Sequence, residues 1–433
     1  MHIFDDWNYD CYSPAFFNIH MNNPLPLNKM FGSEYESELF HEYLHFLQDT
    51  TTTFGITNAK TVFKKILDMI LYVKNAGIST FSLPITGFHK VITKDNYDIV
   101  KSYLQYTNTK LLKSNIIKKI QEQSEDIFDS DLCDFMKIYT YELFFTNGRS
   151  CKFGAHAIME GICHLLQKQI YHIETQKLQI PYDLSYSIWC QYLPSEKNNL
   201  TAFLDLSEAS LMFFNPAEIF ITTVDAIRKG QIRADNNIYK NIVNYKALGK
   251  SNRQVSMIDL FLENHDFCTE SVNEIYKTDI FKEFKNWLLS ILAKGKSERL
   301  DGKPLFSSLL ILKNYSPEER SLWLLNCFKD FGYPVVSNAK GNIFFFNASD
   351  EDTTVSFLTA LAVESVYKCL YYENFEGCEL TRICKFLKES FHVKFDNNRC
   401  MTKPWNNSFN SNHFCPFEIV WKTWGLSEKK FKR

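Results

Sequence analysis

The chain has 433 residues, of which 45% are hydrophobic and 15% are aromatic, and its formal net charge is −2 at pH 7. This length and apolar content support large packed cores and two or three domains of ordinary size, which argues against a disordered chain. The 48 basic and 50 acidic residues lack the basic excess that is typical of nucleic-acid-binding proteins. We therefore expect no nucleic-acid partner.

Two further features bear on the compartment. The first ten residues are acidic and aromatic and lack the basic and apolar regions of a signal peptide, and no run reaches the roughly 18 apolar residues of a membrane span. The twelve cysteines include no CxxC pair and several occur in apolar runs, which is typical of buried free thiols in a reducing compartment. We therefore expect a cytoplasmic protein without a membrane partner and without a disulfide framework.

The N-terminal half begins with residues 1–32, whose Asn, Pro and aromatic side chains predict loops and short strands. A strong helix follows, which we expect to begin at a capping box between Ser33 and Glu36 and to end in the threonine run 50–53. The pattern after it predicts, in order, a helix over 58–75, irregular structure over 76–95 and mostly helix over 96–145.

Residues 151–173 form the second strong helix candidate, because apolar side chains recur there at helical spacing. Further helices are predicted at 201–214, up to about 228, and at 254–264, 277–293, 317–330, 354–373 and 379–390. One strand-like segment occurs at 343–346. The sequence therefore predicts a mainly α or α+β fold, with one domain over 1–240 and a mostly helical domain of unknown role over 241–433.

Residues 41–45 read His-Glu-Tyr-Leu-His, an HExxH motif inside the first strong helix. Side chains at i and i+4 share one helix face, so His41 and His45 can reach one zinc ion. Glu42 lies one step round the helix, where its carboxylate can hold and deprotonate a metal-bound water. The surrounding residues are apolar, and buried polar side chains need partners, which a metal supplies. The alternative interpretation is a surface helix with two solvated histidines.

A catalytic zinc ion usually has three protein ligands and one water, so a third ligand must come from elsewhere. The metzincin pattern needs glycine and histidine where this chain has Gln48 and Thr51, which excludes that class. No glutamate occurs between Glu42 and Glu122, so a short glutamate spacing is excluded as well. Asp68 is an alternative ligand without a supporting motif.

The best candidate is Glu160, an acidic residue in an otherwise apolar helix whose small residues would allow close approach to the motif helix. A lone buried carboxylate costs several kcal/mol unless it is paired or metal-bound. His156 and His164 lie one turn either side of Glu160. Each could support the metal indirectly or polarise a substrate carbonyl. The alternative is that each is an ordinary core histidine. Asp49 could orient His45 or simply belong to the end of the motif helix.

The segments HEYLHFLQDTTTTFG and FGAHAIMEGICHLLQ together resemble a group of uncharacterised bacterial zincin-like proteins, with weaker similarity near 203–220. Their layout resembles the gluzincin ligand set of two histidines and one glutamate. The resemblance implies a zincin-like core in which His41, His45 and Glu160 bind Zn²⁺ and Glu42 is the general base. The insertion between the ligands is longer than in typical gluzincins.

These residues predict a zinc metallopeptidase that hydrolyses a protein or peptide, with Glu42 passing the proton of the attacking water to the leaving amine. The candidate donors to the developing oxyanion are His156, His164, His172, Tyr182 and Tyr186. One alternative is an inactive zincin scaffold with a structural zinc, which binds a regulatory partner through its Phe- and Tyr-rich C-terminal half. The second alternative is an interaction protein that binds no metal and carries the HExxH motif by chance.

Overall fold

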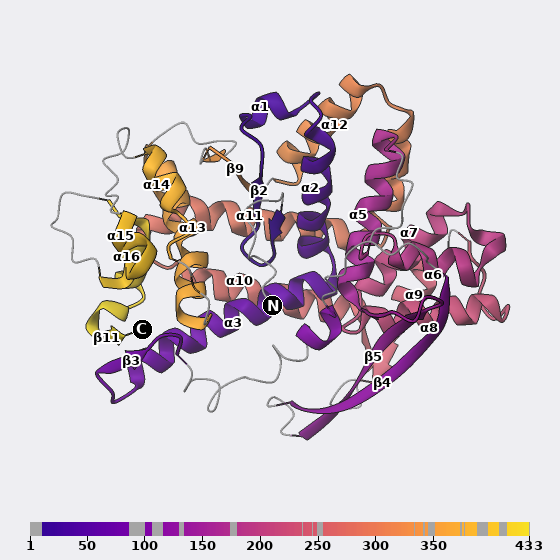
Figure 1. Ribbon diagram of the computed structural model, residues 1–433, viewed down its shortest axis with the longest axis horizontal. Helices are drawn as coiled ribbons and strands as arrows, with labels where there is room; N and C mark the ends of the chain where they lie inside the picture. Colours follow the sequence, from indigo (N-terminus) through magenta and orange to yellow (C-terminus); the bar gives the residue numbers. More distant parts are fainter. Residues whose placement is uncertain are drawn as a thin grey trace.

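The computed structural model describes residues 11–85, 100–105, 116–129, 134–173, 180–235, 237–244, 246–248, 254–332, 334–340, 343–344, 351–372, 375, 377–387, 397–406 and 414–432. Helices make up most of these residues and strands form four small sheets, so the fold is mainly α or α+β (Figure 1). None of the helices in these ranges combines the length and apolar character needed to cross a bilayer.

The longer helices are α2 (Glu36–Thr51), α3 (Thr53–Asn75), α5 (Ala155–Tyr171), α6 (Leu184–Tyr192), α7 (Leu200–Leu211), α8 (Pro216–Arg228), α10 (Met257–Ile275), α11 (Lys282–Leu300), α12 (Pro317–Asp330), α13 (Glu351–Tyr371) and α16 (Pro416–Thr423). The shorter ones are α1 (Leu27–Met30), α9 (Ile238–Val243), α14 (Thr381–Leu387), α15 (Asn397–Thr402), and the 3-10 helices η2 (Pro194–Glu196), η3 (Asp279–Phe281), η4 (Ser307–Asn314), η5 (Pro404–Asn406) and η6 (Leu426–Glu428). The strands are β1 (Cys11–Ser13), β2 (Asn18–Met21), β3 (Thr80–Ser82), β4 (Ile117–Asp129), β5 (Asp134–Phe145), β6 (Ser150–Phe153), β7 (Lys246–Leu248), β8 (Gln254–Ser256), β9 (Val335–Asn338), β10 (Ile343–Phe344) and β11 (Lys430–Lys432).

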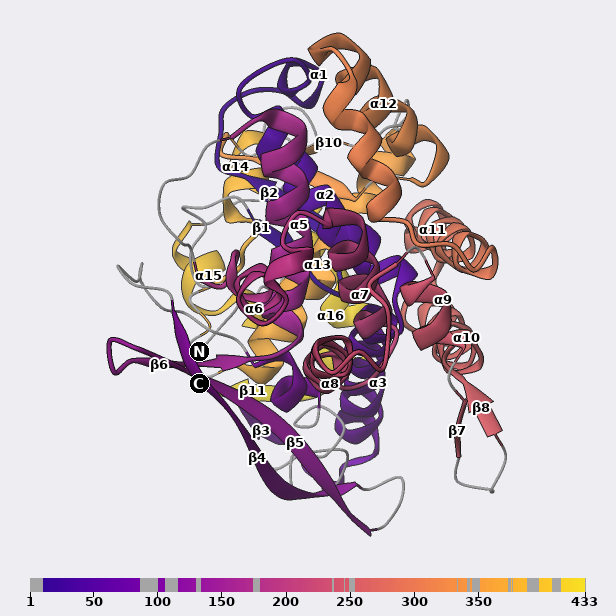
Figure 2. The same cartoon turned by 90° about the vertical axis from the view of Figure 1, so that its right-hand side faces the viewer.

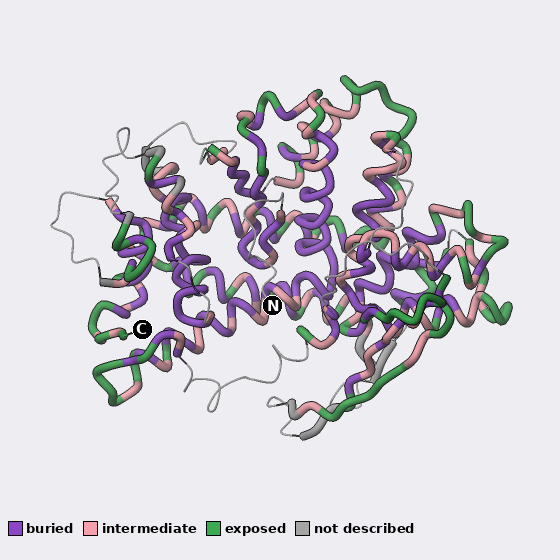
Figure 3. The backbone as a smooth tube through the Cα atoms, in the orientation of Figure 1, coloured by how far each residue is buried: buried purple, intermediate pink, exposed green. Residues whose placement is uncertain are grey.

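The motif helix α2 lies at the centre of the molecule (Figures 1 and 3). Fifteen of its sixteen residues are buried, so its polar side chains cannot be a solvated surface face. Helices α3, α5 and α11 and strands β1 and β2 pack around it. Aromatic contacts anchor it to its neighbours, among them the ring of Tyr43 against Phe328 of α12 and the ring of Phe46 against Phe17. A helix that is enclosed on all sides holds its functional side chains in fixed positions.

The threonine run after the motif both ends α2 and begins α3. The Thr52 hydroxyl oxygen accepts a hydrogen bond from the Gly55 amide, so this residue caps α3. The expected end of the first helix is thus confirmed, and the second helix begins earlier than the predicted residue 58. At the other end of α2 the predicted capping box is wrong. The Ser33 hydroxyl donates to the Met30 carbonyl, and the Glu36 carboxylate accepts from the Gly32 amide.

The prediction of mostly helix over 96–145 is wrong for most of the residues that the structure describes there. Residues 100–104 are helical, but β4 and β5 form a long antiparallel ribbon that reaches away from the helices (Figures 1 and 2). Alternate side chains of β5 are buried, including Tyr141, Leu143 and Phe145, which is the spacing of a strand. Residues 96–99, 106–115 and 130–133 lie outside the described part.

The other predicted helices are present with shifted ends. The ranges 201–214, 317–330 and 354–373 correspond to α7, α12 and α13, and α10 and α11 are longer than predicted. Strand β10 accounts for the first two residues of the expected strand, and the next two are not among those described. The helix predicted at 379–390 is present as α14, and its last three predicted residues are likewise not among those described.

The two halves of the chain share structure on both sides of the predicted boundary near residue 240. Strand β2 pairs in parallel with β9, so one sheet has the order β1-β2-β9-β10. Helix α10 packs along α3, and α11 packs against α2. The motif helix is therefore buried by elements from both halves.

Candidate metal centre

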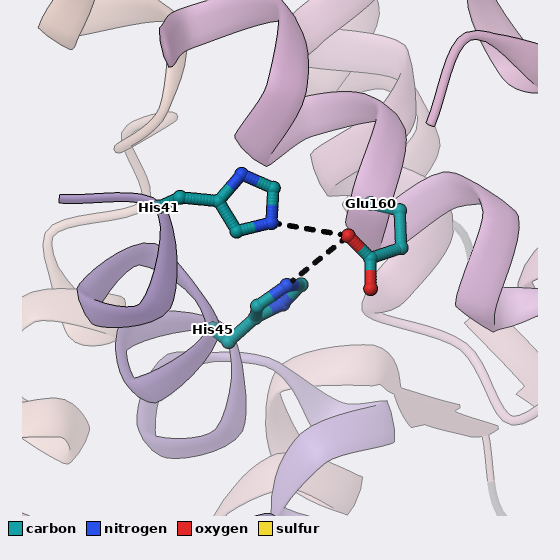
Figure 4. A group of neighbouring side chains, drawn as sticks. All are labelled: His41, His45 and Glu160. Atoms are coloured by element: carbon teal, nitrogen blue, oxygen red, sulfur yellow. Dashed lines mark hydrogen bonds and ion pairs between the residues drawn. The ribbon is translucent and has the colours of Figure 1, made fainter. Parts of the chain in front are cut away.

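Helices α2 and α5 bring three potential metal ligands together (Figure 4). The Nε2 atoms of His41 and His45 lie 3.1 and 3.4 Å from the same oxygen, Oε2 of Glu160. One nitrogen or oxygen from each of the three side chains lies within 4.8 Å of the other two, which singles them out as a possible metal site among the described residues. These are the three residues that the sequence motifs predict as a ligand set.

The spacing of these atoms fits one small metal ion. Two ligand atoms at zinc distances of about 2.0–2.1 Å, separated by a tetrahedral angle, lie about 3.3 Å apart. The observed separations of 3.1 and 3.4 Å bracket that value. The Glu160 side chain is 14% exposed and the two imidazoles 9% and 10%, so the three side chains are almost enclosed but not sealed from solvent.

Two glutamines hold the imidazoles in the orientation that metal binding needs. Oε1 of Gln48 lies 2.9 Å from Nδ1 of His45, and Oε1 of Gln167 lies 3.3 Å from Nδ1 of His41. An amide oxygen can only accept, so each Nδ1 carries the proton and each Nε2 faces Glu160. The glutamine amides in turn donate to the carbonyls of Met159 and Ser37, each across the interface between α2 and α5.

His156 determines which oxygen of Glu160 faces the motif. Its Nε2 lies 3.4 Å from Oε1 of Glu160, and the other oxygen, Oε2, is left for His41 and His45. Burial alone would raise the pKa of the Glu160 carboxyl, but the three surrounding imidazoles hold that pKa well below its usual value. The carboxylate is therefore charged, and the oxygen that faces His41 and His45 is oriented.

The predicted general base, Glu42, is buried on α2 next to the first motif histidine. Burial raises the pKa of the Cys163 thiol, and the charge of Glu42 contributes to that rise. The Cys163 sulfur lies 3.6 Å from Nδ1 of His45. The Glu42 carboxylate therefore influences a group that is in contact with a motif histidine.

Asp49 lies behind the motif. Its Oδ2 accepts from the Tyr12 hydroxyl at 3.1 Å and from the Ala15 amide at 3.2 Å. Burial raises the pKa of the Asp49 carboxyl to about 7, although those hydrogen bonds lower it. The Tyr12 ring stacks on the His45 ring with the centroids 6.5 Å apart, so Asp49 reaches the motif histidine through Tyr12.

His164 and Tyr182 lie on the α5 side of the site. The ring of Tyr182 is 5.9 Å from the ring of His41 and 5.2 Å from that of His164, so it lies beside a proposed ligand. Nε2 of His164 lies 3.6 Å from Asp183, which Lys168 also contacts at 2.9 Å. Burial and the Lys168 charge lower the pKa of His164 to about 4, so this imidazole is neutral.

Three other candidates lie elsewhere. His172 is an exposed residue at the end of α5. Tyr186 donates its hydroxyl to the Lys197 carbonyl at 2.7 Å. Asp68 pairs with Lys64 on α3 at 2.9 Å. None of them belongs to the His41, His45 and Glu160 cluster.

One of the small residues beside Glu160 contacts a different neighbour from the one expected. A Cβ atom at Gly161 would lie 2.0 Å from the Ser185 hydroxyl, so this glycine allows α5 to approach α6 rather than α2. Between α5 and α2, the two glutamine amides provide hydrogen bonds across the interface. Tight packing against α6 fixes the face of α5 that carries Glu160.

Sequence reasoning missed the two glutamines and Tyr12. Gln48 lies three residues after His45 and Gln167 seven residues after Glu160, both at spacings that return to the same helix face. That signal was present but is common to many helices. Tyr12 gave no signal, because only the folded chain brings β1 beside the motif.

Comparison with known proteins adds no family to these observations. No protein-family model, no curated protein and no solved structure matches the chain.

Proposed function

We propose that this protein is a zinc-dependent peptidase whose metal is held by His41, His45 and Glu160. The observation that carries the proposal is the convergence of these side chains at separations that suit one tetrahedral ion, with both motif imidazoles held by glutamine acceptors. A polar cluster inside an otherwise apolar core is costly unless a ligand pairs it. The HExxH motif also contains a carboxylate, Glu42, that is not one of the three proposed ligands.

A zinc ion at this position would supply Lewis acidity and an acidified water molecule. Glu42 would take the proton of the attacking water and deliver it to the leaving amine of a peptide bond. Its burial beside the motif keeps it close to the ligands while limiting competition from solvent. His156 and the two glutamines position the ligands and do not take part in proton transfer.

Tyr182 is the best candidate for the group that stabilises the oxyanion. Its ring packs between His41 and His164, whereas the Tyr186 hydroxyl is directed to the Lys197 carbonyl, just after η2. A phenolic hydroxyl can donate to the developing charge without changing its own charge. His164, whose pKa is lowered to about 4, would contribute only as a neutral donor.

The test compares Glu42→Gln with the wild type and with the control Glu38→Gln, another glutamate of α2. Zinc content is measured together with hydrolysis of a fluorogenic peptide library. We expect Glu42→Gln to keep its zinc and to lose peptidase activity by about 10²–10⁴-fold, as removal of a general base does. Glu38→Gln should retain both.

Two results would contradict the proposal. The first is full activity in Glu42→Gln, which would assign proton transfer to another group. The second is bound zinc with no hydrolysis by the wild type across the library, which would favour the inactive zinc-stabilised scaffold that the sequence leaves open.

A further inference from the structure

A second group of potential metal ligands lies in the C-terminal region, apart from α2 and α5 (Figure 1). Four buried cysteines line one small cavity: Cys378, Cys384, Cys400 and Cys415. They come from different segments, since the first precedes α14, the second lies within it, the third lies in α15 and the fourth directly precedes α16. None of the four forms a disulfide bond in the described part of the chain.

The cavity has the size and lining of a site for a single ion. Its volume is about 10 Å³, which is room for roughly one water-sized particle. The other lining residues offer no charged or imidazole group: Leu380, Thr381, Pro404, Pro416 and Phe417. The hydroxyl of Thr381 is directed to the Cys378 carbonyl. Among the described side chains that line this cavity, sulfur is therefore the principal kind of metal ligand.

The backbone is built to bring two of these cysteines together. The Cys378 amide donates to the Cys400 carbonyl at 2.8 Å. Gly377 has a φ of +119° and packs against Met401, the residue after Cys400. A Cβ atom at Gly377 would lie only 2.6 Å from the Cα of Met401. Only glycine allows this conformation and this approach. The contact sets Cys378 beside α15.

The thiols influence one another electrostatically. Burial raises the pKa of Cys378 and of Cys384, and negative charge on neighbouring thiols raises both further. Burial also raises the pKa of Cys415 to about 11, while the backbone amides of Glu418 and Phe417 at the start of α16 lower it. The four thiol groups therefore lie close enough to act on one another.

The surrounding elements are too short to be stable alone. Helices α14, α15 and α16 have seven, six and eight residues. Isolated helices of that length are marginal in water, so these three depend on contacts with one another and with α13.

We propose that Cys378, Cys384, Cys400 and Cys415 bind one structural zinc ion that holds α14, α15 and α16 together. Four thiolates complete a tetrahedral shell and leave no position for water, so the site does not catalyse a reaction. Each thiol releases its proton to solvent as the ion binds. No three of these sulfurs lie within 4.8 Å of one another, so binding must draw them inward around the cavity.

The first test is made on Glu160→Ala, which removes a ligand of the centre proposed for catalysis and leaves the cysteines unchanged. We expect two zinc ions per wild-type chain and one in this variant. The X-ray absorption spectrum of the remaining zinc should show four sulfur neighbours at about 2.3 Å. A variant without zinc, or a shell of nitrogen and oxygen, would overturn the proposal. An empty catalytic centre would instead give the same four-sulfur zinc in both proteins.

The second test compares Cys400→Ser with Cys369→Ser, a buried cysteine of α13 that does not line the cavity. Cys400→Ser should lose one zinc and the thiolate-to-metal charge-transfer absorption of the cobalt-substituted protein. Cys369→Ser should keep both. Equal zinc in the two variants contradicts the assignment, as does the finding of iron with acid-labile sulfide, or of disulfides after alkylation of the unreduced wild type. The absorption spectrum of Glu160→Ala decides the question if Cys400→Ser does not fold.

Discussion

Gln48 on α2 and Gln167 on α5 make equivalent bridges at the centre of the molecule. Each accepts a hydrogen bond from Nδ1 of one motif histidine and donates to a backbone carbonyl of the opposite helix. The same two side chains therefore set the imidazole tautomers and the spacing between the helices. Ligand geometry and helix packing are coupled through them.

Replacing either glutamine by alanine should weaken zinc binding by about 10–100-fold, which is the usual effect of removing an indirect support of a ligand. Gln48→Ala frees the ring of His45, and Gln167→Ala that of His41. Competition against a chromophoric chelator measures the affinity. The matched control is Gln191→Ala, because Gln191 also bonds to backbone, at Ile117, far from the motif in sequence. Unchanged affinity in both Gln48→Ala and Gln167→Ala would show that packing alone orients the imidazoles.

Much of the site was predictable, because its signals are local. The i, i+4 spacing of His41 and His45 places both on one helix face, and an isolated acid in an apolar helix marked Glu160. The structure brings these three side chains together. The zincin assignment remains a prediction, since a ligand cluster alone does not define a family.

The parts that could not be predicted depend on long-range contacts. The sequence predicted mostly helix over 96–145, but β4 pairs with β5 along its whole length as an antiparallel ribbon. The cysteines looked scattered because residues 378 and 415 become neighbours only after α14, α15 and α16 pack. Spacing in sequence carries little information about such contacts.

Tyr182→Phe should lower kcat by roughly 10²-fold and leave zinc content unchanged, if its hydroxyl stabilises the oxyanion. The ring contacts with His41 and His164 are kept in this variant, so a structural effect is minimised. Tyr186→Phe is the control, because its hydroxyl is directed to the Lys197 carbonyl. Steady-state kinetics on the best library peptide provide the measurement. Equal kcat values for Tyr182→Phe and the wild type would return the role to His164 or His156.

The ion pair of Arg299 and Glu208 should be a major determinant of stability. Their side chains are 1% and 0% exposed, the nitrogen and oxygen lie 2.6 Å apart, and Arg299 also donates to the Tyr239 hydroxyl. Removing one partner leaves a buried unpaired charge, so Arg299→Ala should lower the free energy of unfolding by about 3–5 kcal/mol. Urea unfolding measures this. Arg228→Ala, which breaks an exposed pair with Asp225, should cause no measurable change, and an equal effect of the two variants would contradict this prediction.

Asp205 should make stability fall as pH rises. Its side chain is buried on α7, and burial raises the pKa of its carboxyl to about 6, above the ordinary value of 3.8. Between these two values the folded chain binds more protons than the unfolded chain, so the contribution of the neutral carboxyl to stability is present below pH 4 and is lost by about pH 6. The shift corresponds to about 3 kcal/mol.

Asp205→Asn keeps an acceptor for the Ser307 hydroxyl but cannot ionise. The difference in unfolding free energy between this variant and the wild type should therefore shift by about 3 kcal/mol in favour of the variant between pH 4 and pH 7. Urea titrations at several pH values measure the two curves. Curves that stay parallel over this range would mean that Asp205 is ionised in the folded chain, with its charge satisfied by the backbone and side chains around η4.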